Sequence, residues 1–141
     1  MKIDKKGLIS VLFEEGCDSP QRPSSDLTEK VIGCAFKVSN VLGCGYLEKV
    51  YENAFAYELR KSGFRAIQQP RLNVEYDGII VGVYEPDIIV EDSLIIEVKA
   101  LRALEDAHKA QCLNYLKSTG IRLALLINFG VPKIEVKRVA L

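Results

Sequence analysis

The chain has 141 residues, of which 48% are hydrophobic and 27% are charged. A domain usually takes ~100–200 residues, so this length predicts one domain, and the composition excludes a disordered or collagen-like chain. The 19 basic and 19 acidic residues give a formal net charge of +0. Bulk charge therefore points to neither a nucleic acid nor a membrane as the partner.

The cysteines and apolar segments favour a reduced, cytoplasmic protein. The four cysteines form no Cys-x-x-Cys pair and the chain has one histidine, which argues against a structural zinc site. The charged start Met1–Lys6 and the short apolar stretch Leu8–Phe13 differ from an export signal. No apolar run reaches the ~18 residues that a membrane span requires. We therefore expect no membrane partner.

Residues 1–25 are interpreted as an N-terminal arm, because Gly16–Ser25 is rich in proline and serine. The domain proper is expected to span residues 26–141. Asp26 and Glu29 resemble a capping box, which predicts a helix that starts at Asp26 and stops at Gly43. Its apolar face is predicted from helical spacing to contain Leu27, Val31, Cys34, Val38 and Val41.

A second helix is expected over about Tyr46–Ser62, with Leu47, Val50, Tyr51, Ala54 and Phe55 on its apolar side. Strands are then expected at Phe64–Gln69, Arg71–Tyr76, Ile79–Tyr84, Asp87–Glu91 and Leu94–Ala100, a third helix at Leu104–Lys117, and strands at Arg122–Asn128 and Lys133–Val139. Asp77-Gly78 is typical of a two-residue primed hairpin turn. This order predicts a mixed α/β fold with a central sheet flanked by helices.

Two adjacent strands carry the residues that point to chemistry. Strand alternation places Glu97 and Lys99 on one face. If the hairpin turns about Asp92, residues whose numbers sum to about 184 face each other, which sets Asp87 opposite Glu97. Two carboxylates so placed repel each other unless a proton or a divalent cation such as Mg²⁺ lies between them. Alternatively, Glu97 and Lys99 form the solvated face of a half-exposed strand and pair only with each other.

Lys99 would complete a hydrolytic mechanism. An ammonium on the same face as a metal-binding glutamate can orient or help deprotonate a water, and it offsets the charge that builds on a phosphate.

Polar residues on the predicted helices extend the cluster. On the third helix, Leu104, His108, Gln111 and Tyr115 fall within a narrow arc. On the second helix, Glu48 lies at the rim of the apolar side, where a charge is costly. Each residue alone fits an ordinary helix surface better than a catalytic role, and only the group as a whole favours a site.

Glu58 also falls on the apolar side of the second helix. It is expected either to pair with a basic residue such as Arg65 or to mark the point where the helix frays.

Four segments resemble a known family. Gly45–Tyr51 matches the G-x-x-E-x-x-Y signature of the bacterial GxxExxY proteins, which are placed in the PD-(D/E)XK nuclease superfamily. Pro86-Asp87 followed by Glu97-Val98-Lys99 resembles the superfamily motif itself. Gln111–Tyr115 resembles the Q-x-x-x-Y helix of the RecB-like branch, and the resemblance continues through Ile127-Asn128-Phe129-Gly130. The resemblance runs from about Leu27 to the C-terminus and implies a restriction-endonuclease-like core.

The resemblance also implies roles for individual residues. Asp87, Glu97 and Glu48 would bind Mg²⁺, with Mn²⁺ as a substitute, and Lys99 would assist the attacking water.

On the third helix, Gln111 and Tyr115 would steady the site or touch the substrate backbone, and His108, one turn earlier, would join them. The arm before Asp26 lies outside the resemblance and receives no role.

The leading hypothesis is a magnesium-dependent nuclease that hydrolyses DNA by in-line attack of a metal-activated water. One alternative is a non-catalytic nucleic-acid-binding or regulatory module that retains the nuclease fold. Another is a protein whose carboxylates serve stability alone, in which case Asp87→Asn would raise the melting temperature. Symmetry favours a homodimer, because a duplex cutter usually needs two sites and this chain supplies one.

Overall fold

The structure, a computed structural model, describes residues 24–141. The predicted arm lies almost entirely outside the described residues. Each predicted helix and strand has a counterpart, in the order α1 (Ser25–Leu42), α2 (Glu48–Lys61), β1 (Ala66–Gln68), β2 (Leu72–Tyr76), β3 (Ile79–Tyr84), β4 (Ile88–Val90), β5 (Leu94–Lys99), α3 (Asp106–Thr119), β6 (Leu123–Asn128) and β7 (Glu135–Ala140). The predicted mixed α/β architecture is confirmed. None of the helices in this range is long and apolar enough to cross a membrane.

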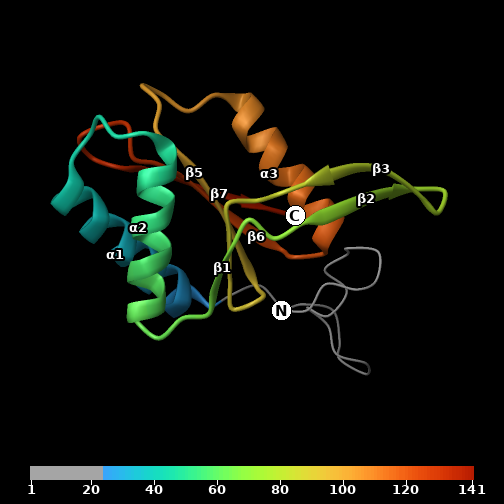
Figure 1. Cartoon of the computed structure of the whole chain (residues 1–141), viewed down its shortest axis with the longest axis horizontal. Helices are drawn as coiled ribbons and strands as arrows, with labels where there is room; N and C mark the ends of the chain where they lie inside the picture. The colour runs from blue at the N-terminus through green and yellow to red at the C-terminus, as the bar shows by residue number, and fades with distance from the viewer. Residues whose placement is uncertain (1–23) are drawn as a thin grey trace.

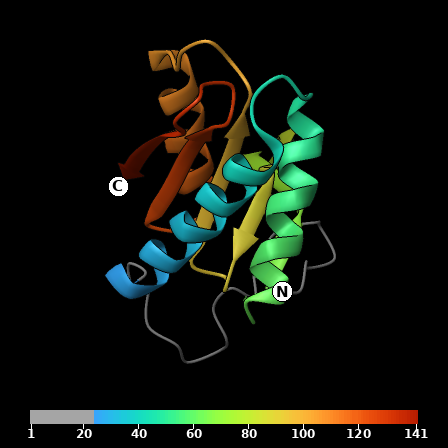
Figure 2. The ribbon, with the colours of Figure 1, turned by 90° about the vertical axis from the view of Figure 1, so that its left-hand side faces the viewer.

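The central sheet has five strands in the order β1-β4-β5-β6-β7. Strands β5 and β6 are parallel, and the other neighbours are antiparallel. Parallel neighbours need a long crossover connection, and α3 supplies it. Helices α1 and α2 lie side by side across one face, and α3 covers the other (Figures 1 and 2). Strand β5 is thus buried between helices, which explains its nearly continuous apolar sequence.

Side-chain alternation along β5 divides the interior into two clusters. Leu94, Ile96 and Val98 pack with α1 and α2, whereas Ile95 packs with α3. Residues 97 and 99 have the same parity as Ile95, so the backbone directs Glu97 towards the α3 side of the sheet. The predicted alternation is confirmed, and it places the polar end of β5 beside α3.

Helix α1 starts one residue earlier than predicted and has a different cap. The Ser24 side chain accepts a hydrogen bond from the Leu27 N–H at 3.1 Å, so Ser24 is the N-cap and the predicted Asp26 capping box is wrong. Serine is as good an N-cap as aspartate. Asp26 instead lies in the first turn, where its negative charge interacts favourably with the helix dipole. It also pairs with Lys30.

Three residues predicted to be buried are exposed instead. Val41 is 78% exposed, Leu47 is 81% exposed and Val50 is 39% exposed. All three flank the connection between α1 and α2: Val41 lies in the last turn of α1, Leu47 is the N-cap of α2 and Val50 lies in its first turn. The apolar stripe that packs on the sheet therefore ends before the helices do.

Strands β2 and β3 form a separate two-stranded sheet. Asp77 and Gly78 both have positive φ, at 54° and 76°, which confirms the predicted primed turn. The register shifts between Val74 and Glu75, so β3 carries one extra residue there.

The end of β5 is clamped to the end of β6. The Asn128 side chain accepts hydrogen bonds from the backbone N–H groups of Leu101 and Gly130, and it donates to the Leu101 carbonyl at 3.0 Å. A Cβ on Gly130 would lie 2.6 Å from the carbonyl carbon of Ala100 and closer still to the Leu101 backbone. Glycine at 130 therefore allows the close approach that fixes the chain just beyond Lys99.

Gly130→Ala is expected to destabilise the protein by ~1–3 kcal/mol, because the backbone of residues 100 and 101 would have to move. The matched control is Gly33→Ala in α1, where a Cβ meets no atom within 4 Å. That change should stabilise the protein by up to ~1 kcal/mol, since alanine is the better helix former. Denaturant unfolding measures both, and equal effects would contradict the clamp.

Candidate active site

The centre of the site is a pair of carboxylates on β4 and β5. The register Ile88↔Ile96, Ile89↔Ile95 and Val90↔Leu94 is the predicted one, and it sets Asp87 beside Glu97. The Asp87 N–H donates to Glu97 Oε1 at 3.0 Å, and the Val98 N–H donates to Asp87 Oδ2 at 2.7 Å. Each carboxylate is thus held by the backbone of the neighbouring strand.

Burial makes this pair costly to ionise. Burial raises the pKa of Glu97 from its ordinary 4.5 to about 8, and the neighbouring Asp87 charge adds to the effect. Burial also raises the pKa of Asp87 from 3.8 to about 6, although the Val98 N–H works in the opposite direction. Near neutral pH, the two carboxyls favour keeping a proton unless a cation compensates their charge.

Lys99 follows at the end of β5 and is half-buried. Its charge lowers the pKa of both Asp87 and Glu97, which indicates that it lies near them. None of the ion pairs formed within residues 24–141 involves Lys99. Since Glu97 is only 3% exposed, the alternative of a solvated Glu97–Lys99 pair is wrong.

Glu48 lies in the first turn of α2 and is half-buried. Its charge is one of the smaller causes that raise the pKa of Asp87 and of Glu97. Across residues 24–141, however, no three side chains of the types His, Cys, Asp and Glu form a group that could hold a metal ion. The structure therefore brings Asp87 and Glu97 together, and a direct role of Glu48 as a third ligand stays a prediction.

The turn before Glu48 is fixed by Tyr51. The Tyr51 hydroxyl donates to the Gly43 carbonyl at 2.5 Å and accepts from the Tyr46 N–H at 3.2 Å. Its ring stacks on Phe129, with centroids 5.0 Å apart, and the Phe129 N–H donates to the Lys99 carbonyl at 2.8 Å. The tyrosine of the G-x-x-E-x-x-Y segment thus links the start of α2 to the end of β5.

On α3, the Gln111 side-chain amide donates to the Tyr115 hydroxyl at 3.1 Å. Tyr115 is buried and meets the Tyr84 ring edge-on, with centroids 5.4 Å apart. Burial, followed by the charges of Glu97 and Asp87, raises the pKa of Tyr115 well above its usual range. Gln111 and Tyr115, which were expected in one narrow arc of the helix, are thus in direct contact, and the Tyr115 hydroxyl stays protonated near the carboxylates.

The His108 side chain caps the start of α3. Helix α3 begins at Asp106, so the predicted start at Leu104 is wrong and His108 falls in the first turn. The Glu105 N–H donates to His108 Nδ1 at 2.9 Å, and the Glu105 side chain accepts from the His108 N–H. His108 therefore completes a capping box.

Glu52 and Gln69 belong to the site, and the sequence did not predict either. Glu52 is 3% exposed and accepts hydrogen bonds from Lys49, Gln68 and Gln69 at 2.6–2.9 Å. The Gln69 side-chain amide also donates to Asp87 Oδ1 at 3.3 Å, and the Gln69 backbone N–H donates to the Asp87 carbonyl. Glu52 thus contacts Asp87 through Gln69, and its negative charge also helps to raise the pKa of Asp87. One sequence signal was available, because Glu52 lies one helical turn after Glu48.

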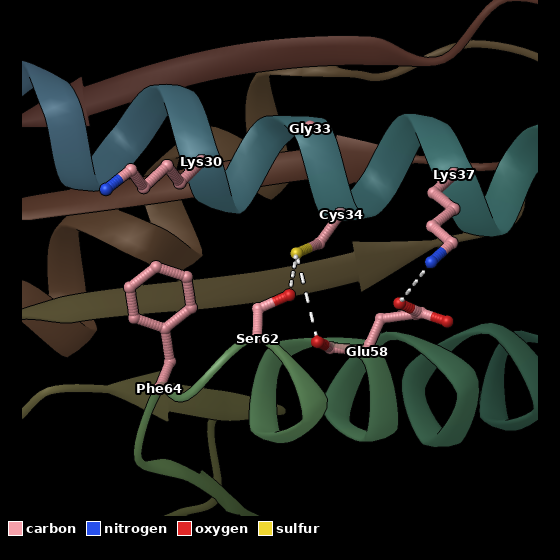
Figure 3. A pocket seen from close by; sticks show the side chains of 7 residues that line it. All are labelled: Lys30, Gly33, Cys34, Lys37, Glu58, Ser62 and Phe64. Carbon is pink, nitrogen blue, oxygen red and sulfur yellow. Dashed lines mark hydrogen bonds and ion pairs between the residues drawn. The ribbon is translucent and has the colours of Figure 1, made fainter.

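Glu58 pairs with a basic residue, as one of the two expectations had it, but with Lys37 and not with Arg65. Its carboxylate pairs with Lys37 of α1 at 3.3 Å, and Arg65 pairs with Asp92 instead. This ion pair borders a cavity of about 380 Å³ between α1 and α2, also lined by Cys34 and Ser62, whose sulfur and oxygen lie 3.4 Å apart (Figure 3). None of the lining residues belongs to the carboxylate cluster, so this cavity is separate from the candidate active site.

Comparisons with known proteins bear on the fold and the family. The family model described as the PD-(D/E)XK nuclease superfamily matches residues 25–139. The crystal structure of SSO0001 is 18% identical with a TM-score of 0.52, over 96% of this chain and 74% of that chain. An alkaline exonuclease from Laribacter hongkongensis is 11% identical with a TM-score of 0.42, over 85% and 72%. No curated protein sequence matches the chain.

The free energy of unfolding of the metal-free protein is expected to fall as the pH rises from about 4.5 to about 8. The folded state raises both carboxyl pKa values, so it retains protons that the unfolded chain has already released. One pKa unit corresponds to ~1.4 kcal/mol, so the loss should exceed ~1 kcal/mol. Urea unfolding at a series of pH values, with a chelator present, measures it.

Glu97→Gln is the control for this prediction. It removes the ionisable group but keeps an oxygen that can accept from the Asp87 N–H, so the pH profile should flatten. A wild-type stability that increases over the same range would contradict the assignment.

Glu52→Ala is expected to cost ~1–3 kcal/mol, because it leaves the Lys49, Gln68 and Gln69 donors without their shared acceptor. Glu58→Ala, on the same helix, should cost less than ~1 kcal/mol, since its partner Lys37 is largely exposed. Denaturant unfolding of both variants measures the two losses of stability. Similar losses of stability in the two variants would show that the contacts of Glu52 contribute no more than an ordinary surface ion pair does.

Proposed function

Since the chain belongs to the PD-(D/E)XK nuclease superfamily, we propose that it is a magnesium-dependent nuclease that hydrolyses DNA phosphodiester bonds. Nucleases of this superfamily generally use divalent metal ions and act on nucleic acids. The observation that carries the proposal is the buried pair of Asp87 and Glu97, joined across β4 and β5, with the half-buried Lys99 at the end of β5.

The donor set fits a divalent metal ion. Asp87 and Glu97 offer carboxylate oxygens, which Mg²⁺ and Mn²⁺ prefer, and burial makes their charges repel strongly without a cation. These two residues would hold the ion, with Glu48 adding negative charge nearby. The bound ion supplies positive charge that makes a bound water more acidic and neutralises a phosphate oxygen.

The remaining residues act on the substrate. The Lys99 ammonium would face the scissile phosphate, orient the attacking water and offset the charge that builds during attack. Tyr115 stays protonated and, with Gln111, would donate hydrogen bonds to the sugar-phosphate backbone. Asn128, Phe129 and Gly130 hold the end of β5, so that Glu97 and Lys99 keep one geometry.

We infer several finer features from the sequence. The Gly45–Tyr51 segment favours the bacterial GxxExxY branch, and the cysteine usage favours a cytoplasmic location. DNA is the proposed nucleic acid. We expect its binding to be weak, salt-sensitive and dependent on metal, because a divalent ion would offset the acidic site residues and leave the remaining surface slightly basic. A homodimer would present two sites to the two strands of a duplex.

Asp87→Ala and Lys99→Ala are expected to reduce cleavage by at least ~100-fold while the fold is retained, because each removes a group that acts directly on the reaction. Single-stranded, double-stranded and branched DNA with Mg²⁺ or Mn²⁺ form the substrate panel. The control is Lys137→Ala on β7, an exposed lysine outside the site, which should cleave as the wild type does.

Calorimetry with Mn²⁺ separates the remaining outcomes. Asp87→Ala should lose metal binding, whereas Lys99→Ala should retain it. A wild-type protein that binds Mn²⁺ but cleaves nothing on the panel would instead be a non-catalytic binding or regulatory module. If metal is not bound and Asp87→Asn raises the melting temperature, the carboxylates have no role in catalysis.

A further inference from the structure

The β2–β3 hairpin exposes an apolar surface that the proposed reaction does not use. Tyr76 is 75% exposed, Ile79 65%, Ile80 47%, Val81 61% and Val83 40%. Figure 1 shows the hairpin turn extending well beyond α3. Scattered apolar residues are normal on a protein surface, but a group on one element indicates an interaction site.

The base of the hairpin is anchored and its outer half is free. Leu72, at the start of β2, is buried against the α3 cluster, and Val74 is half-buried. Tyr76 lies on the same face by alternation and pairs with Ile79, yet both are mostly exposed. The apolar row therefore continues past the point where α3 covers it.

Strand β3 also has an unpaired edge. The sheet contains only β2 and β3, so the outer edge of β3 pairs with no strand of residues 24–141. A two-stranded hairpin is marginally stable in water. Proteins usually protect a free edge with charges, proline or bulges. Ile79–Tyr84 contains no charge and no proline, and its one bulge is at Val81.

The charge of the hairpin favours a protein strand over a nucleic acid as its partner. Residues 72–84 contain no lysine or arginine, and their only charges are Glu75 and Asp77. This negative surface disfavours the phosphates of a nucleic acid. Both acidic residues lie on β2 or in the turn, which leaves β3 uncharged and suited to pair with a second uncharged strand.

We propose that β3 of two copies of this chain pair antiparallel about a two-fold axis near Val81 and Gly82, forming a four-stranded sheet across the dimer. An antiparallel pair is self-complementary, as a two-fold interface requires. It places the two Ile79–Tyr84 segments side by side and the two Asp77 turns at opposite ends. The interface depends on the exposed hairpin and not on nuclease activity, so failure of either proposal leaves the other standing.

Sedimentation velocity of the full chain over a wide concentration range tests the interface. The wild type should form dimers. The double variant Val81→Lys, Val83→Lys should be monomeric, because lysine protects an edge strand. Val41→Lys on α1 is the matched control, since Val41 is 78% exposed, and it should dimerise as the wild type does. Far-UV circular dichroism verifies that each variant is folded.

A second measurement does not depend on the lysine variants. With Cys17, Cys34, Cys44 and Cys112 replaced by serine or alanine, Val81→Cys should form an intermolecular disulfide under mild oxidation, and Val41→Cys should not. A wild type that stays monomeric at every concentration, a dimer that survives both lysines, or equal cross-linking at residues 41 and 81 would overturn the proposal.

Discussion

The structure depends on one electrostatic constraint, the burial of two carboxylates on neighbouring antiparallel strands. Asp87 and Glu97 each accept a hydrogen bond from the backbone of the other strand, so neither can turn away to solvent without breaking it. These bonds fix the positions of the carboxylates but do not cancel their mutual repulsion. The fold thus preorganises a site that is stabilised when it binds a proton or a cation.

Everything around the pair restricts its movement. Tyr51 and Phe129 join the start of α2 to the end of β5, while Asn128 and Gly130 bind the backbone just after Lys99. Residues from both faces of the sheet therefore support a single strand end. Such support is what a reacting group needs in order to hold a constant geometry.

The carboxylate pair was predictable because it is local in sequence. Strand alternation and the turn at Asp92 determine the β4–β5 register, and that register alone sets Asp87 beside Glu97. Glu52 and Gln69 were not predictable in this way, because their contacts depend on how α2 packs against β1 and on the positive φ of Gln69. Val41 and Leu47 were assigned to the core because helical spacing does not show where a supporting surface ends.

The parallel pairing of β5 with β6 also has a kinetic consequence. The strands that carry Asp87 and Glu97 are joined by a short turn, and short connections close quickly. Asn128 and Phe129 reach the end of β5 only after the whole of α3 has crossed over the sheet. The two carboxylates should therefore meet early in folding, and docking of β6 later converts a loose pair into a rigid site.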